Sequence, residues 1–229
     1  MMSISTVAWA DTTVVRSSFG NSESNPRTGL VLDKEENLYG TIQGGGGYDR
    51  GAVFELSRGN AGWTEETLYS FNQSDGSSPM ATLIFDHGGN LYGTTIAGGV
   101  YDAGVVFELT PGLGGVWTET ALHNFAGVNG DGGAPQSNLM FDNSGNLYGT
   151  TTLGGINGGG CGGLGCGTAF ELAPTADGKW KERVLHRFTG GLDGGQPYAG
   201  FILDAAGNLY ATTSSGGAAA QGTVFEIRP

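Results

Sequence analysis

A seven-residue motif occurs four times in this chain of 229 residues, and no other feature restricts the fold as strongly. The letters GNLYGTT stand at Gly89–Thr95 and again, unchanged, at Gly145–Thr151. Near copies occupy Glu36–Ile42 and Gly207–Thr213, so that successive asparagines of the motif are 53, 56 and 62 residues apart. Self-similarity at a nearly constant period is the signature of a repeat architecture.

Two further motifs accompany each copy, and a third accompanies the first three. An apolar segment ending in aspartate precedes every copy, a segment of the form VFEL follows it, and a segment that begins with tryptophan comes after VFEL in the first three units. All four segments have strand length, are rich in Val, Ile, Leu, Phe, Tyr and Thr, and are separated by Gly, Asp and Pro. We therefore predict an all-β fold, a four-bladed β-propeller with four antiparallel strands in each blade. The single domain divides into units of about residues 20–71, 72–125, 126–188 and 189–229.

The ends of the chain predict how such a ring closes. The last unit stops at VFEIRP without its tryptophan segment, whereas the chain opens with WADTTVVRSSF from Trp9. We expect residues 9–19 to pair with the strand around residues 223–228 and so to complete the last blade. This closure would leave no exposed strand edge at the seam.

The repeat also predicts its own turns. The pattern D-x-x-G-N-L-Y is typical of a hairpin in which the glycine adopts the left-handed conformation. The first unit has Glu36 where the others have glycine, which predicts backbone strain there and a gain of about 1 kcal/mol for Glu36→Gly. We expect the repeated residues to be scaffold, with Leu and Tyr filling the space between blades and the following glycine keeping the backbone slim.

Composition excludes several classes of function. The net charge is -12, with only 10 Lys and Arg residues and no basic cluster, so we expect no nucleic-acid partner. No apolar run approaches 18 residues, so we expect no membrane insertion, and the first residues do not form a signal peptide as written. Cys161 and Cys166 in a glycine-rich loop favour a local disulfide and an oxidising compartment over a metal pair.

Nearly the whole chain resembles the GloVer (Gloeobacter/Verrucomicrobia) tandem repeat. The resemblance lies in the motif FDxxGNLYGTT, followed by GG and VFEL. A weaker similarity is to NHL and gluconolactonase-like propellers. The first resemblance implies a secreted or cell-surface protein of bacteria, and it implies no general activity. The second implies that the aspartate-ending strand is innermost and the tryptophan strand outermost, which puts the connections that vary between units on one face.

Variable loops on a rigid frame are where binding usually occurs. We expect one face to gather candidate ligand-binding residues near a central depression: Arg27, Tyr48, Asp49, Arg50, Tyr101, Asp102, Gln136 and Tyr198. Asp75, Asp131 and Asp193 join them from different blades and are candidate catalytic carboxylates. Each precedes glycine, so a turn role is the competing interpretation.

Carboxylates and aromatic rings together favour a carbohydrate or another small polar ligand. The alternatives are a glycoside hydrolase that uses two of the loop aspartates and a lactonase-like hydrolase. Purely structural display and a homodimer also stay open. We expect no metal at the three histidines, because His123 and His186 share an outer-strand position that another unit fills with Tyr69. Calcium is the one cofactor that the acidic loops leave possible.

Overall fold

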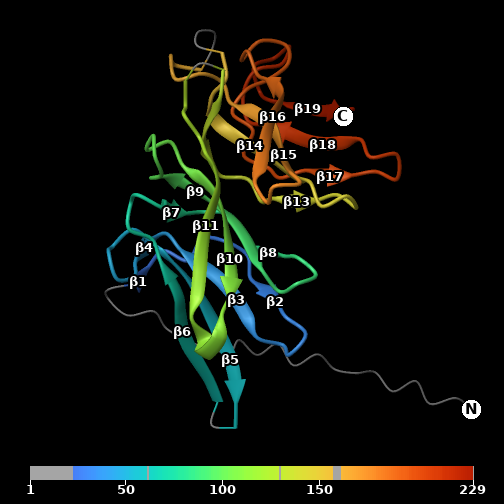
Figure 1. Cartoon of the computed structure of the whole chain (residues 1–229). Helices are drawn as coiled ribbons and strands as arrows, with labels where there is room; N and C mark the ends of the chain where they lie inside the picture. The colour runs from blue at the N-terminus through green and yellow to red at the C-terminus, as the bar shows by residue number, and fades with distance from the viewer. Residues whose placement is uncertain (1–22, 61, 129, 157–160, 229) are drawn as a thin grey trace, which may run out of the picture.

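The computed structural model describes residues 23–60, 62–128, 130–156 and 161–228. It is an all-β chain of several antiparallel sheets, and the only helical element described is the short 3-10 turn η1 (Leu113–Gly115). Figure 1 shows the sheets succeeding one another in chain order. Among the described residues no helix is long and apolar enough to cross a bilayer.

Four sheets correspond to the four sequence units. The first has the order β2 (Val31–Leu32), β3 (Leu38–Ile42), β5 (Ala52–Gly59), β6 (Gly62–Ser70). The second places β8 (Ile84–Phe85) and β9 (Leu91–Ala97) beside β10 (Val105–Pro111) and β11 (Trp117–Asn124). The third repeats this with β13 (Met140–Phe141), β14 (Leu147–Gly154), β15 (Thr168–Pro174) and β16 (Trp180–Arg187). The last has three strands, β17 (Ile202–Leu203), β18 (Leu209–Thr213) and β19 (Thr223–Ile227). The order of strands within a sheet is the expected one.

Four very short strands are additional to this pattern. They are β1 (Glu23–Ser24), β4 (Gly44–Gly45), β7 (Ser77–Pro79) and β12 (Gly132–Pro135). β7 pairs with the end of β9, and β12 pairs with the end of β14. The connection that enters each of these two sheets is therefore fixed along the strand carrying the NLYGTT motif.

The core consists of layers between neighbouring sheets. The phenylalanine that follows each outer strand packs edge-on against the phenylalanine of the next sheet's FE motif. Ring centroids are 5.0 Å apart for Phe71 and Phe107 and 5.1 Å apart for Phe125 and Phe170. A Cβ on Gly149 would lie 2.6 Å from the Phe170 ring, so a side chain cannot replace this glycine of the motif without displacing the ring.

The predicted turn geometry is confirmed. Gly89, Gly145 and Gly207 have φ of 88°, 83° and 85°, and Glu36 has φ of 66°. Glu36 is exposed and is held in the left-handed region by the same hairpin. The first unit therefore carries a backbone strain that its three relatives avoid.

The described sheets do not close into a ring. Val224 of β19 is 79% exposed, whereas Val53 and Val106 at the corresponding positions are fully buried between sheets. The face of the last sheet that would meet another blade is thus uncovered. Residues 9–19, which we expect to complete this sheet, lie outside the described residues, so the count of four closed blades stays a prediction.

Candidate functional site

Each D-x-x-G turn is organised by its aspartate. Asp142 Oδ1 accepts hydrogen bonds from the backbone N–H groups of Ser144 and Asn146, both at 2.8 Å. Asp142 Oδ2 accepts from Asn146 Nδ2 at 2.8 Å and from the Tyr148 hydroxyl at 3.2 Å. Burial opposes ionisation, but these hydrogen bonds outweigh it and hold the pKa of Asp142 below its ordinary value. Asp33, Asp86 and Asp204 repeat the arrangement.

The tyrosine of the motif links this turn to the FE strand. The Tyr148 hydroxyl also lies 3.4 Å from Glu171 Oε1, and Tyr92 has the same relation to Glu108 at 2.8 Å. Burial and the two neighbouring carboxylates raise the pKa of Tyr148 to about 12. Since the aspartate's acceptor positions are occupied by its own turn, the repeated carboxylates serve the fold and are not free to bind a ligand.

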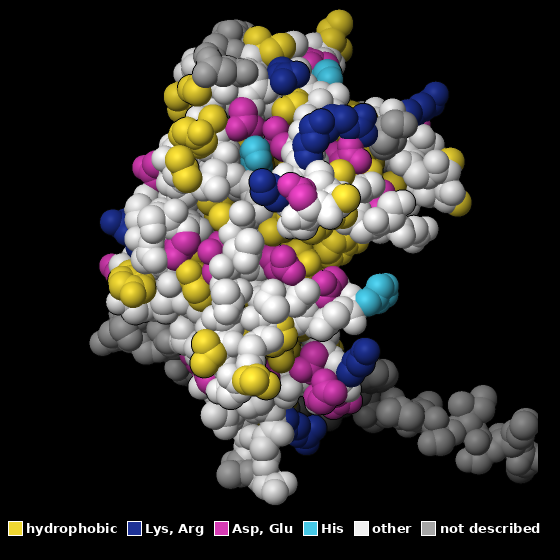
Figure 2. Space-filling model, viewed as in Figure 1, with side chains coloured by type: hydrophobic (Ala, Val, Ile, Leu, Met, Phe, Trp, Pro, Cys, Tyr) yellow, Lys and Arg dark blue, Asp and Glu magenta, His cyan; other side chains and the backbone are white. Residues whose placement is uncertain are grey.

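Three hollows of the surface lie between successive turns of this kind. Figure 1 shows the β2–β3, β8–β9, β13–β14 and β17–β18 turns projecting on one side of the molecule, at the right of the view, and Figure 2 shows the surface notched there. The middle hollow has a cavity volume of about 650 Å³. It is lined by aromatic residues, by turn residues and by one proline: Phe85, Tyr92, Phe141 and Trp180, then Asp86, His87, Asp142, Asn143, Ser144 and Gly145, with Pro174.

Neighbouring hollows have different linings. The one between the first two turns contains Lys34, Glu35 and His87 and has about 380 Å³. The one between the last two turns contains Asn143, Ser144, Ala205 and Ala206 and has about 580 Å³. These are the two x positions of each D-x-x-G motif. The repeat therefore keeps the frame of each hollow constant and changes the side chains that face into it.

The residues we expected to form a binding face lie on the opposite side, and none of them lines these hollows. Asp49 and Asp102 have φ of 57° and 55° and accept hydrogen bonds from Gly45 N and Gly98 N in their own turns. Tyr48, Tyr101 and Tyr198 are 64%, 61% and 49% exposed. The tyrosines are thus accessible, while the two aspartates hold loop structure.

The other three candidates on this face differ in their surroundings. Arg27 and Arg50 are exposed, and Gln136 donates from Nε2 to the Thr152 hydroxyl at 3.1 Å. Gln73 Nε2 donates to Asp102 Oδ1, and Gly99 N donates to the Gln73 carbonyl at 2.8 Å. These bonds join the connection between the first two sheets to the β9–β10 connection.

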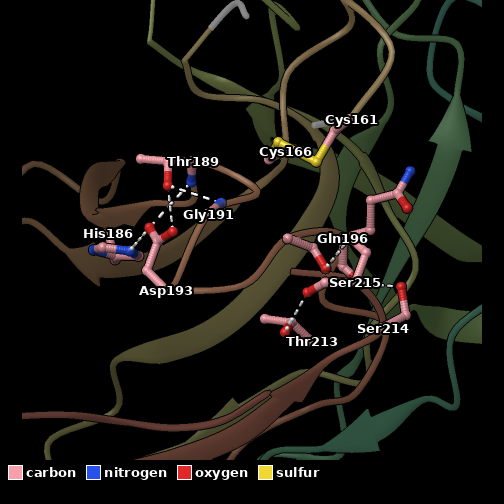
Figure 3. Close-up of a disulfide and its surroundings, with 11 residues drawn as sticks. Cys161, Cys166, His186, Thr189, Gly191, Asp193, Gln196, Thr213, Ser214 and Ser215 are labelled. Carbon is pink, nitrogen blue, oxygen red and sulfur yellow. Dashed lines mark hydrogen bonds and ion pairs between the residues drawn. A yellow bond between two sulfur atoms is a disulfide. The ribbon is translucent and has the colours of Figure 1, made fainter. Parts of the chain in front are cut away.

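The candidate catalytic aspartates accept hydrogen bonds from residues in or beside their own connections. Asp75 Oδ1 accepts from Asn72 N at 2.9 Å, and its Oδ2 accepts from the Tyr69 hydroxyl at 2.7 Å. Asp193 accepts from Thr189, and its Oδ2 lies 3.0 Å from His186 Nε2 (Figure 3). Burial opposes ionisation, yet these contacts lower the pKa of Asp193. Such a carboxyl is poorly suited to the role of general acid.

Asp131 belongs to a cluster that sequence reasoning missed. Its two oxygens accept from Ala126 N and Gly132 N, both at 2.6 Å. His123 Nε2 lies 3.6 Å from Asp131 Oδ1, and Glu182 of the next sheet approaches both. One ligand-type atom from each of the three residues lies within 4.8 Å of the others. The sequence signal was the alignment of His123 with Tyr69 and His186, which identified the position but not its neighbour from β16.

The Cys161–Cys166 loop is particular to the third unit. The two cysteines form a disulfide with their Cα atoms 5.3 Å apart. Cys166 is fully buried, and its carbonyl accepts a hydrogen bond from Gln196 N at 2.7 Å. Figure 3 shows the disulfide above the connection that carries Gln196 and Asp193. The disulfide-bonded loop of the third sheet is thus joined by this hydrogen bond to the connection that enters the last sheet.

Antiparallel sheets of three to five strands, repeated along the chain and packed face to face, define a propeller-like repeat protein. The chain belongs to the Gloeobacter/Verrucomicrobia repeat family, whose profile matches residues 3–164. No curated protein matches it significantly.

Solved structures share the fold. One, described as a candidate gluconolactonase, has a TM-score of 0.52 and 19% identity, with 88% of this chain and 59% of that chain covered. Another, a protein of unknown function from Dyadobacter fermentans, has a TM-score of 0.51 and 12% identity, with 84% and 62% covered. The chain thus spans about three-fifths of the length of each. At these identities the likeness defines the fold and no activity.

Proposed function

We propose that this chain is a secreted or surface-displayed repeat protein that binds a small polar ligand, a carbohydrate by class, in the hollows between its D-x-x-G turns. The observation that carries the proposal is the middle hollow. Its volume of about 650 Å³ is within the range of small-molecule sites, which combine apolar walls with a few polar groups. The disulfide supports an oxidising setting.

The lining of this hollow suits a sugar. The Trp180 ring is partly exposed, and it packs with the Tyr92 and Phe141 rings into one aromatic wall. Aromatic faces stack on the apolar C–H faces of sugars and leave the hydroxyl groups for hydrogen bonding. His87, Asn143 and Ser144 are exposed on the turns that border this wall and offer donors and acceptors of both kinds.

The test uses a variant that the chain itself provides. Asn143→Ala/Ser144→Ala changes the third turn to the D-A-A-G of the fourth, where Asp204 keeps all four hydrogen bonds. We expect this double variant, combined with His87→Ala, to lose binding on a glycan array while its melting temperature stays unchanged. Tyr101→Ala/Tyr198→Ala, on the opposite face, is the matched control and should still bind. Loss of binding only in the control would move the site to the variable-loop face.

A hydrolase is the second candidate. The structural neighbour described as a candidate gluconolactonase favours a lactonase-like reaction. Glycoside cleavage is less favoured, because Asp75 and Asp193 accept hydrogen bonds from their own connections. Assays of lactones and chromogenic glycosides with the wild-type chain, and with Asp75→Asn, Asp131→Asn and Asp193→Asn, separate these options. Turnover that one of the three variants abolishes would favour the carboxylate mechanism over simple binding.

Ring closure is the finer structural part of the proposal. The last sheet has three strands and an exposed Val224, and residues 9–19 have the tryptophan-segment pattern that this sheet lacks. If the chain closes into four blades, Val224→Asp should lower the melting temperature of a monomer. A dimer by size-exclusion mass would mean that two copies cover one another's end sheets. A monomer that is indifferent to Val224→Asp would refute both.

A further inference from the structure

We propose that His123, Asp131 and Glu182 bind a divalent first-row transition ion such as Zn²⁺, which fastens the second sheet to the third. His123 comes from the end of β11, Asp131 from the connection that follows it, and Glu182 from β16. None of these three residues lines the hollows between the D-x-x-G turns, and the exposed tyrosines are not part of the site. It goes beyond the proposed ligand binding and does not depend on it.

Unpaired polar atoms are the first argument. His123 Nε2 and Glu182 Oε1 are both buried, and neither has a hydrogen-bond partner. Buried polar groups without a partner are rare in folded proteins, and an ion at the site is one explanation for them. Arg187, whose Nε donates to the Gly130 carbonyl at 2.6 Å, makes no hydrogen bond to Glu182 Oε1.

The distances are the second argument. The 3.6 Å between His123 Nε2 and Asp131 Oδ1 is too long for a hydrogen bond. Two ligands at about 2.1 Å from a tetrahedral ion lie about 3.4 Å apart, close to the observed separation. Glu182 completes a group of three within 4.8 Å, so only a small side-chain movement is needed. The N–H groups of Ala126 and Gly132 orient the Asp131 carboxylate and leave each oxygen a second lone pair.

The other junctions of the chain are an internal comparison. At the first junction, the Tyr69 hydroxyl donates directly to Asp75 at 2.7 Å, and Glu119 occupies the position of Glu182. At the third, His186 Nε2 lies at 3.0 Å from Asp193. Glu119 Oε1 is buried and unpaired, as Glu182 Oε1 is, so the difference lies in the ring: among the described residues, only the second junction has a ring nitrogen that stands off from its aspartate. That arrangement favours an ion between the groups over a direct contact.

The donor set indicates the class of metal. One imidazole nitrogen with two carboxylates suits Zn²⁺ and its neighbours in the first transition row, whereas calcium prefers six to eight oxygens. Three protein ligands leave one coordination position for water. The chain's overall charge of -12 also attracts cations.

The experiment is titration of the purified full chain with Zn²⁺ by calorimetry and with Co²⁺ by its visible spectrum. We expect one tetrahedral site per chain and, at a hundredfold excess over the dissociation constant, a melting temperature raised by roughly 5–10 °C. His123→Tyr copies the first junction, so it should fold, and it should weaken binding at least tenfold. Glu182→Gln is the second variant, and His186→Tyr is the control that should bind as the wild type does.

The converse substitution tests the geometry. Tyr69→His places a histidine beside Asp75 and Glu119, and it should raise the stoichiometry towards two ions per chain. Failure of the wild-type chain to bind Zn²⁺ or Co²⁺ would overturn the proposal. Binding that survives both His123→Tyr and Glu182→Gln, or binding of calcium alone, would overturn it as well.

Discussion

Replacing Glu36 by glycine should stabilise the protein, although glycine usually weakens a fold. The last position of the D-x-x-G motif is glycine in three of the four turns and Glu36 in the first. The φ of Glu36 is 66°. Its backbone N–H points to the Asp33 carbonyl at 3.4 Å, as the Gly89 N–H points to the Asp86 carbonyl at 3.4 Å. The first turn thus adopts the geometry of its relatives with an unsuitable residue.

The magnitude comes from the backbone alone. A Cβ built on Gly89, Gly145 or Gly207 meets no heavy atom within 4 Å, so steric crowding by neighbours adds nothing. A residue with a Cβ in the left-handed region costs about 1–2 kcal/mol. The greater freedom of glycine in the unfolded chain takes back about 0.5–1 kcal/mol. The net gain for Glu36→Gly is about 0.5–1 kcal/mol, or about 1–4 °C in melting temperature for a domain of this size.

Urea unfolding followed by tryptophan fluorescence measures the difference. Glu36→Gln removes the charge but keeps the strain, so it should leave the free energy of unfolding nearly unchanged. Gly145→Ala introduces the strain into the third turn and should cost about 1 kcal/mol. Glu35→Gly, one residue earlier and outside the left-handed region, should destabilise slightly. A Glu36→Gly variant that is no more stable than the wild type, with Gly145→Ala also neutral, would refute the reasoning.

Three further predictions concern the scaffold. Burial and the charge of Asp75 raise the pKa of Glu119 to about 7, so the folded chain binds this proton more tightly than the unfolded chain does, and stability falls as the pH rises from about 4.5 to 7. Glu119→Gln should therefore match the wild type at pH 4 and exceed it at pH 8 in urea titrations. Tyr148→Phe should lower the free energy of unfolding by about 1 kcal/mol, because the Tyr148 hydroxyl is buried between Asp142 and Glu171. Tyr210→Phe at the exposed last sheet should change it by no more than about 0.5 kcal/mol. Equal losses would contradict the role of burial. Reduction of the Cys161–Cys166 disulfide should lower the free energy of unfolding by no more than about 2 kcal/mol, because it closes a short loop, and a calorimetric scan with and without dithiothreitol measures this.

The regular part of the fold could be predicted because the same pattern recurs in all four units. The order of the segments predicted which strands pair, and the glycine after D-x-x in three units predicted a left-handed backbone at Glu36 in the first. Packing followed from the same repetition, since Gly149 leaves room only for the Phe170 ring. Local sequence rules suffice here because strand pairing within a sheet joins segments adjacent in the chain.

The parts that escaped prediction depend on contacts between units. β7 and β12 arise because the connections lie along the ends of β9 and β14, and Ser78 and Ala134 adopt φ of 56° and 50° although neither is glycine. Neither serine nor alanine favours this left-handed conformation. Likewise, Glu182 approaches His123 only because β16 packs beside β11, and no spacing in the sequence relates the two. For the loop aspartates the sequence left a turn role and a ligand role open, because their hydrogen-bond partners depend on how each connection folds.

Repetition and function occupy different positions within the same turn. Asp142, Asn146 and Tyr148 are fixed because each is a partner in one closed hydrogen-bond network, and a change at any of them leaves a donor or acceptor unpaired. Of the two residues between Asp142 and Gly145, Ser144 contributes its backbone N–H to that network, and neither contributes a side chain. They can therefore vary without cost to the fold, as Lys34 and Glu35, His87 and Gly88, and Ala205 and Ala206 do in the other units. Because these side chains line the hollows, the same network that makes the repeat invariant leaves the chemistry of each hollow free to differ.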